Sequence, residues 1–299
     1  MNIQKEKCIE KWKCGCEADK RIANASKNFE TWFLQIPDEY KEISSILIQN
    51  LEYYSRHTTN KLLKILHEEL IQNPKVTDGN TIYAFIKSKD GKSNSSNDYW
   101  TEYKLINEIN PELCYENINA IKDEQWEYIQ NIIFIDDFSG SAKSFIDELK
   151  KCETRYNRKD IFFITINIME FAREQIAQYA FEKGFNICPI FAFMQQKAFE
   201  HDLFEDNNRT KKEIISLSKY LKIPKNEHLG YRESQALVAF YNNTPNNTIG
   251  FIRYDTDTYQ SLFPRNHNPK PTWQTMKREK KTHKITNYNN LIKSGEYNE

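Results

Sequence analysis

Two adjacent carboxylates stand directly after an apolar run near the middle of the chain. The run is Ile132–Ile135, and the acids are Asp136 and Asp137. Carboxylate oxygens accept hydrogen bonds from vicinal hydroxyls, and they also hold hydrated Mg²⁺. They repel a phosphate, so a phosphate must bind at a neighbouring position. The pair is therefore predicted to be catalytic, and to hold a sugar diol or a Mg²⁺ ion that the ligand also binds.

A loop of small and hydroxyl-bearing residues follows the acids. Its members are Ser139, Gly140, Ser141, Ala142, Lys143 and Ser144. Glycine permits a tight turn, and small side chains let an anion approach backbone N–H groups at the start of a helix. Lys143 adds a positive charge. We expect this loop to bind a phosphate, so the acids and the loop together predict a sugar phosphate as ligand.

Apolar runs that alternate with helical patterns predict the elements that position these residues. Strand-like runs occupy Thr81–Ile86, Leu113–Ile118, Asn131–Asp136, Ile161–Ile168 and Phe185–Phe193. Helical patterns begin near Asp98 and cover Ser144–Cys152 and Phe171–Lys183. Strands that alternate with helices of this length favour a parallel α/β sheet with right-handed crossovers. Such sheets bind ligands at the carboxyl ends of their strands.

The pattern divides the chain into three predicted segments. They are a helical segment over 1–75, an α/β core over 76–200, and a mostly helical extension over 201–299 that ends in a basic tail. Within the extension, helices are expected over 211–221 and 231–241, and 242–252 is expected to be a turn that leads into a short strand. The tail from residue 266 combines lysines and arginines with aromatic residues; such a run is more often a solvated charged segment, and RNA or DNA contact is the alternative hypothesis.

Composition excludes several classes of protein. Basic and acidic side chains number 42 each, so the net charge of zero does not point to a partner. Hydrophobic residues make up 39% of the chain, which is enough for a packed core. We expect no membrane span and no secretory signal, and therefore a cytoplasmic protein with reduced cysteines. Cys8, Cys14 and Cys16 lack the CxxC spacing and the nearby histidine of a zinc site.

The acid pair and the loop resemble the binding motif of phosphoribosyltransferases. That motif has four apolar residues, two acids and a Thr/Gly-rich loop, matched here by Ile132–Ile135, Asp136-Asp137 and Ser141–Ser144. The resemblance implies that the acids hold the ribose 2′- and 3′-hydroxyls of phosphoribosyl pyrophosphate, and that the loop holds its 5′-phosphate. The loop Lys87–Ser93 stands where the family binds pyrophosphate. Its lysines Lys87, Lys89 and Lys92 suit that anion.

More specifically, the chain resembles phosphoribosyltransferase-like proteins with a carboxy-terminal extension, over roughly residues 28–268. The further marks are the helical lead-in over 28–70, Asn243–Thr248 and Leu262–Arg265. Such proteins occur in bacterial antiphage loci, including retron systems, which implies an effector role and a reverse transcriptase or a nucleic acid as partner. In the family loop, two glycines stand where this chain has Ala142-Lys143. No long loop that would close over the site is evident between Cys114 and Asn131.

Several alternatives stay open at this stage. The chain is either an enzyme that transfers or hydrolyses the phosphoribosyl group, or a non-catalytic sensor or assembly subunit that keeps the pocket. The acids and serines are also compatible with ordinary helix capping. A nucleotide triphosphatase P-loop is a weaker alternative, because Lys143-Ser144 matches the end of that motif but Asp137 and Ala142 replace its glycines. The oligomeric state is not determined by the sequence.

Overall fold

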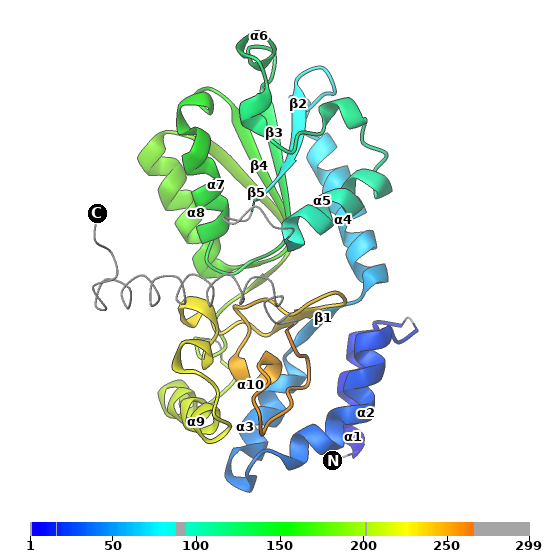
Figure 1. The fold of residues 1–299 in the computed structure, drawn as a ribbon, viewed down its shortest axis with the longest axis vertical. Coiled ribbons are helices and arrows are strands. Elements are labelled where there is room, and N and C mark those ends of the chain that lie inside the picture. The colour runs from blue at the N-terminus through cyan, green and yellow to red at the C-terminus, as the bar shows by residue number, and fades with distance from the viewer. Residues whose placement is uncertain (1, 16, 88–93, 201, 266–299) are drawn as a thin grey trace, which may run out of the picture. The chain divides into compact units, whose positions relative to one another are not determined.

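A four-stranded parallel sheet forms the centre of the α/β part. The computed structural model describes residues 2–15, 17–87, 94–200 and 202–265. The strand order is β2-β3-β4-β5. The strands are β2 (Thr81–Phe85), β3 (Asn131–Ser139), β4 (Asp160–Met169) and β5 (Asn186–Gln195). Helices cover both faces of this sheet (Figure 1): α4 (Arg56–Ile71) and α5 (Ser95–Ile106) lie on one, and α7 (Lys143–Leu149) and α8 (Glu170–Lys183) lie on the other. The expected α/β fold class is confirmed.

The sheet departs from the predicted strands at two places. Leu113–Ile118 is not a strand, because Pro111–Leu113 forms a 3-10 turn capped by Asn110, and only Cys114 bridges to Tyr83. In contrast, β3 continues past its expected end at Asp136 as far as Ser139, because β4 is long enough to pair with it there. The two acids therefore lie inside a strand and not after it.

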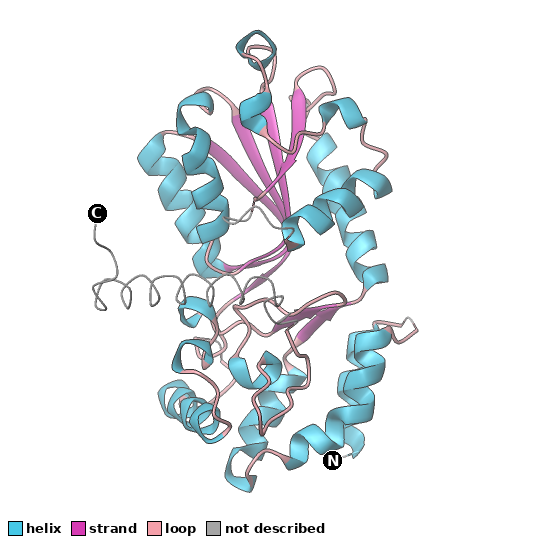
Figure 2. Cartoon of the chain, in the orientation of Figure 1, coloured by secondary structure: helices cyan, strands magenta, loops and turns pink. Residues whose placement is uncertain are grey.

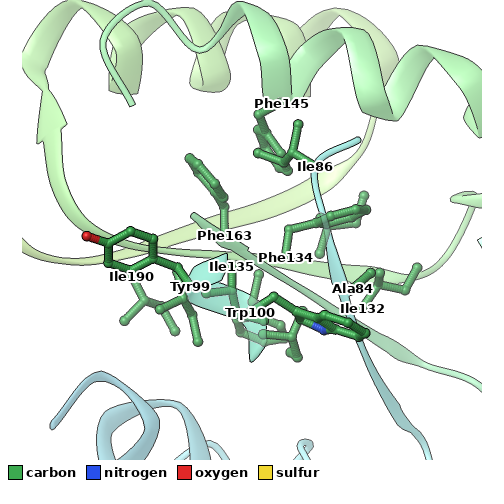
Figure 3. Close-up of a cluster of buried hydrophobic side chains, with 14 of the residues drawn as sticks. Ala84, Ile86, Tyr99, Trp100, Ile132, Phe134, Ile135, Phe145, Phe163 and Ile190 are labelled. Carbon is green, nitrogen blue, oxygen red and sulfur yellow. The ribbon is translucent and has the colours of Figure 1, made fainter. Parts of the chain in front are cut away.

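Buried aromatic and branched side chains hold the helices on the sheet. Every residue of β3 is buried, as a strand covered on both faces requires. Phe145 of α7 stacks on Phe163 of β4 at a centroid distance of 4.2 Å and meets Phe134 of β3 edge to face at 5.6 Å (Figure 3). These rings fix α7 against the sheet. The loop that joins β3 to α7 is thereby anchored at both ends.

A second hydrophobic cluster joins the amino-terminal helices to the extension. Its helices are α1 (Asn2–Lys13), α2 (Lys20–Leu34), α3 (Asp38–Gln49), α9 (Asn207–Tyr220) and α10 (Gly250–Arg253). A small parallel pair, β1 (Glu52–Tyr54) with β6 (Val238–Phe240), connects the two regions (Figure 2). Trp32, buried in this cluster, donates a 2.7 Å hydrogen bond to Tyr259. The domain boundaries expected at residues 75 and 200 stay predictions.

Two elements predicted for the extension are not the ones that the structure contains. In the amino-terminal segment, the short strand β1 lies among the predicted helices. The helix expected over 231–241 is wrong, because Arg232, Glu233 and Gln235 have positive φ values and 238–240 pairs with β1. The strand expected near 249–252 is the helix α10. Short connecting helices occupy Pro111–Leu113, Ile118–Ala120, Asp123–Trp126 (α6), Lys150–Arg155, Lys225–Glu227 and Tyr231–Glu233. In the described part of the chain, no helix has both the length and the apolar character that a membrane crossing requires.

Candidate ribose phosphate site

The acid pair lies where β3 extends beyond its neighbour β2. Phe85, the last residue of β2, pairs with Ile135, so Asp136 and Asp137 begin where β2 ends. The two carboxyl groups lie close enough to interact with each other, and the charge of Asp137 also acts on Asp98 of α5. Both side chains are buried, with exposures of 8% and 7%. The backbone N–H of Asp137 donates a 2.9 Å hydrogen bond to Asp136 Oδ1.

The charged form of Asp136 is electrostatically unfavourable in the free protein. Burial raises the pKa of Asp136 well above its usual value, and the neighbouring Asp137 raises it further. Burial also raises the pKa of Asp98 on α5, and the charge of Asp137 adds to this shift. Buried carboxyls of like charge are typical of a site that is completed by a cation or by hydroxyl donors of a ligand.

The predicted phosphate loop is a three-residue connection, Gly140, Ser141 and Ala142, between β3 and α7. Ala142 has φ 54° and ψ −2°, in the left-handed region, and its side chain is buried. Glycine is the residue that normally adopts this left-handed conformation. Ala142 adopts it at an energetic cost, because its Cβ atom approaches the following carbonyl oxygen. The connection is also too short for a P-loop, whose first glycine would fall at Asp137, inside β3.

Replacing Ala142 with glycine is expected to leave the free energy of unfolding within about 0.5 kcal/mol of the wild-type value. Left-handed alanine costs about 1–2 kcal/mol. Relief of that strain offsets the loss of one buried methyl group, about 0.8 kcal/mol, and the greater chain entropy of glycine. The matched control is Ala177→Gly on the exposed face of α8, which should lose about 1 kcal/mol. Urea denaturation measures both, and an equal or larger loss at Ala142 would contradict the strain.

The acids and the loop line one cavity of about 390 Å³. Every residue from Asp136 to Phe145 contributes to its wall, so the structure brings together all the predicted site residues of β3 and the loop. The volume is that of a small-molecule site. The remaining walls are Ile86, Phe163, Asn94–Ser96 from the start of α5, and Tyr231, Asn243–Asn247 and Arg265 from the extension.

The wall from α5 is fixed by side-chain hydrogen bonds to the end of β2. Ser96 accepts a 2.9 Å bond from the N–H of Ile86 and donates a 2.6 Å bond to the carbonyl of Ile135. Asn94 donates 2.7 Å to the carbonyl of Ile86 and caps α5. These residues were missed by the sequence reasoning, although a helix start that follows a strand end is a recognisable signal.

The wall from the extension touches the phosphate loop directly. A Cβ atom on Gly140 would lie 2.1 to 2.6 Å from the side-chain atoms of Asn247, so only glycine fits there. Two hydrogen bonds with Ser234 hold Asn247 in place. The side-chain Nδ2 of Asn247 donates a 3.0 Å hydrogen bond to Ser234 Oγ, and the main-chain carbonyl of Asn247 accepts a hydrogen bond from the same hydroxyl. The extension thus forms part of the wall of the cavity and fixes the position of the loop.

Of the lysines predicted to bind the ligand, Lys143 lines the cavity and Lys87 does not. Lys143 lines it, but its Nζ forms a 2.8 Å ion pair with Asp147. Lys87 follows β2, and its backbone N–H donates 3.0 Å to Glu148 Oε2; its side chain does not contribute to the described wall. Lys89 and Lys92 lie outside the described residues, as do the basic tail and Cys16. The pyrophosphate role of the lysine loop stays a prediction.

A divalent ion would find two protein ligands here. The described residues contain no cluster of three or more His, Cys, Asp or Glu side chains suited to a metal. Mg²⁺ commonly binds through one or two carboxylates together with water and ligand phosphates. Asp136 and Asp137 fit that pattern, because they are adjacent, buried and without a compensating ion pair among the described residues. The acid pair is thus chemically suited to Mg²⁺ that arrives with its ligand.

The fold and the acid-and-loop cavity define a phosphoribosyltransferase-like α/β protein. The chain belongs to the PRTase-CE family, whose model matches residues 29–265. Among solved structures, Helicobacter pylori Xanthine-Guanine-Hypoxanthine Phosphoribosyltransferase is similar at 16% identity and a TM-score of 0.30, over 47% of this chain and 90% of that chain. The comparison with curated proteins found no match.

Proposed function

We propose that the protein binds phosphoribosyl pyrophosphate, or a related ribose phosphate, together with Mg²⁺. The observation that carries this proposal is that a buried acid pair and a loop of small, hydroxyl-bearing residues line the same cavity. Asp136 and Asp137 accept hydrogen bonds from the ribose hydroxyls. Backbone N–H groups and hydroxyls of Ser139–Ser144 donate to the 5′-phosphate. The order of the chain therefore matches the order of groups along the sugar phosphate.

The favoured activity is phosphoribosyl transfer. The bond from C1 of the ribose to the pyrophosphate oxygen breaks, the pyrophosphate leaves with the bonding electrons, and a nucleophile forms a new bond to C1. Mg²⁺, when bound, would neutralise charge on the departing pyrophosphate. The acid pair orients the sugar, and the wall from the extension excludes water from the reacting carbon.

A calorimetric titration of the full chain tests the binding step. Phosphoribosyl pyrophosphate is added with Mg²⁺ and, separately, with a chelator. We expect micromolar to millimolar binding that depends on Mg²⁺, as is usual for substrates. The proposal would be rejected if phosphoribosyl pyrophosphate produced no heat of binding and ribose 5-phosphate did not compete with it for the protein.

A non-catalytic sensor is the second candidate. The observation that favours it is the ion pair of Lys143 with Asp147, which leaves the phosphate loop less positive than its sequence indicates. Labelled phosphoribosyl pyrophosphate is incubated with the protein and a mixture of nucleobases, nucleotides and RNA. Pyrophosphate release that requires Asp136 and Asp137 supports the enzyme, and tight binding without release supports the sensor.

The affinity for the Mg²⁺ complex of phosphoribosyl pyrophosphate is expected to rise with pH. The pKa of Asp136 is raised in the free protein, so binding to its carboxylate form must displace a proton. Below that pKa, each pH unit should change the affinity by up to about tenfold. The measurement is proton release on binding from about pH 5 to 8.5, with the release from phosphate groups, whose pKa is about 6, accounted for. Titrations in buffers of different ionisation enthalpy report it, and zero release would contradict the role of Asp136.

We further propose an effector role in bacterial antiphage defence, in the cytoplasm, with a reverse transcriptase or a nucleic acid as partner. Support for this role comes from the resemblance of the extension marks to proteins of such loci. The test is phage plaque formation on cells that carry the gene with its neighbours. Protection that disappears with Asp136→Asn supports the role, and equal plaque counts with the wild-type gene and with an empty vector reject it.

A further inference from the structure

An arginine from the extension reaches the wall of the ribose phosphate cavity. Arg265 lines the cavity, although it lies more than a hundred residues beyond the acid pair in the sequence. Its guanidinium is close enough to Asp137 for the two charges to interact, whereas Asp136 interacts mainly with Asp137. Arg265 and Asp137 therefore belong to the same wall of the cavity.

The position of Arg265 is fixed from both sides. Its backbone N–H donates a 2.9 Å hydrogen bond to the carbonyl of Arg253, and its Nη1 donates 2.9 Å to the carbonyl of Thr244. Thr244 is fully buried, and its hydroxyl donates to the carbonyl of Phe263 and accepts from Arg21. In the part of the chain that the structure describes, one of the five guanidinium donors is bound to a protein acceptor, and a forked pair of N–H groups is available to a ligand.

The neighbouring arginine has a different role. Arg253 is 1% exposed, and it forms an ion pair with Glu227 and hydrogen bonds to the carbonyls of Thr248 and Asn246. These bonds hold the segment that carries Asn247 against the loop. Burial lowers the pKa of the Arg265 guanidinium, and the charge of Arg253 lowers it further. A nearby anion would relieve both effects.

Charge in the described cavity wall is then distributed unevenly. The acid pair supplies two carboxyl groups, the Lys143 amine is paired with Asp147, and the Arg265 guanidinium donates to a backbone carbonyl and interacts with the charge of Asp137. Planar guanidinium groups bind phosphate oxygens through two parallel hydrogen bonds. A second anionic group of the ligand would be stabilised at this place.

We propose that Arg265 binds the anionic group carried on C1 of the ribose, which is the pyrophosphate in phosphoribosyl pyrophosphate. The inference rests on the proposed function, since it takes the ribose to lie over the acid pair with its 5′-phosphate in the Ser139–Ser144 loop. The C1 substituent then extends away from that loop, past Asp137. The extension thereby selects ligands with an anion at C1 over ribose 5-phosphate.

The test compares two ligands that differ in this one group. Phosphoribosyl pyrophosphate and ribose 5-phosphate are titrated with Mg²⁺ into the full-length wild-type protein and into Arg265→Gln and Arg265→Lys. Loss of a charge-assisted pair of hydrogen bonds predicts that Arg265→Gln lowers the affinity for phosphoribosyl pyrophosphate about 10- to 100-fold. Ribose 5-phosphate should change by less than about threefold. Arg265→Lys keeps the charge and should recover part of the loss.

Controls separate this effect from damage to the fold. Arg209→Gln removes an exposed arginine of the same extension, which pairs with Glu213 on α9, and should alter neither affinity. If Arg265→Gln fails to fold, the test is made with Arg265→Lys. An Arg265→Lys protein that binds both ligands with wild-type affinity would overturn the inference. Equal losses for the two ligands, or an unchanged phosphoribosyl pyrophosphate affinity, would also overturn it. A wild-type protein that binds neither ligand rejects the proposed function itself, and the inference with it.

Discussion

Replacing Asp136 with asparagine is expected to abolish ribose phosphate binding and, at the same time, to stabilise the free protein. The loss of binding follows because an amide cannot hold Mg²⁺ or two hydroxyls as a carboxylate does, and a loss of at least about 100-fold is expected. The gain in stability follows from the raised pKa of Asp136. Each unit of that shift destabilises the ionised folded protein by about 1.4 kcal/mol.

The sign of the pH dependence is part of the same prediction. A carboxyl whose pKa is raised on folding binds its proton more tightly in the folded state, so its contribution to stability falls as pH rises from the usual value near 4 to the raised value. Asparagine does not titrate, so the stability advantage of Asp136→Asn should grow over this window. Urea denaturation of both proteins between pH 4 and 8 measures it.

Two further variants show whether the loss of binding is specific to the acid pair. Asp137→Asn should also abolish binding, because both acids line the cavity. Asp98→Asn changes an exposed acid on α5 near Asp137 and should retain binding. If Asp136→Asn destabilised the protein and left affinity unchanged, the acid pair would be a structural feature of the strand and not a ligand site.

Replacing Gly140 with alanine is expected to destabilise the protein by about 2–3 kcal/mol and to disrupt the site. The added methyl group would overlap the side chain of Asn247, and excess volume in a packed region typically costs 1–3 kcal/mol. Asn247 cannot easily move, because Ser234 and the N–H of Ala236 hold it. Chemical denaturation and ligand titration measure the two effects.

A double substitution identifies the cause. Asn247→Ala removes the three atoms that meet the new methyl group, and alone should cost about 1 kcal/mol for the lost hydrogen bond to Ser234. Combined with Gly140→Ala, the loss should be smaller than the sum by at least about 1 kcal/mol. Gly79→Ala is the matched control, since its nearest neighbour would be 3.9 Å away. Strict additivity would show that the extension does not constrain the loop.

The sequence by itself determined the class of fold and the centre of the site. Apolar runs such as Ile161–Ile168 predict strands buried on both faces, and their alternation with helices leaves a parallel sheet as the main solution. The acid pair and the loop are contiguous in the chain, so their proximity needs no tertiary information. That is why Asp136, Asp137 and Ser139–Ser144 were predicted together and line one cavity.

Only the tertiary structure decided what encloses this centre. Asn247 reaches Gly140, and Arg265 reaches the cavity, through packing of an extension whose hydrophobic partners are the amino-terminal helices. Such contacts join positions separated by a hundred residues or more, and local periodicity carries no information on them. The ion pair that neutralises Lys143 and the left-handed backbone of Ala142 likewise depend on neighbours fixed by the fold. Local pattern specifies elements and contiguous motifs, whereas charge balance and enclosure arise from side chains that meet only after the chain has packed.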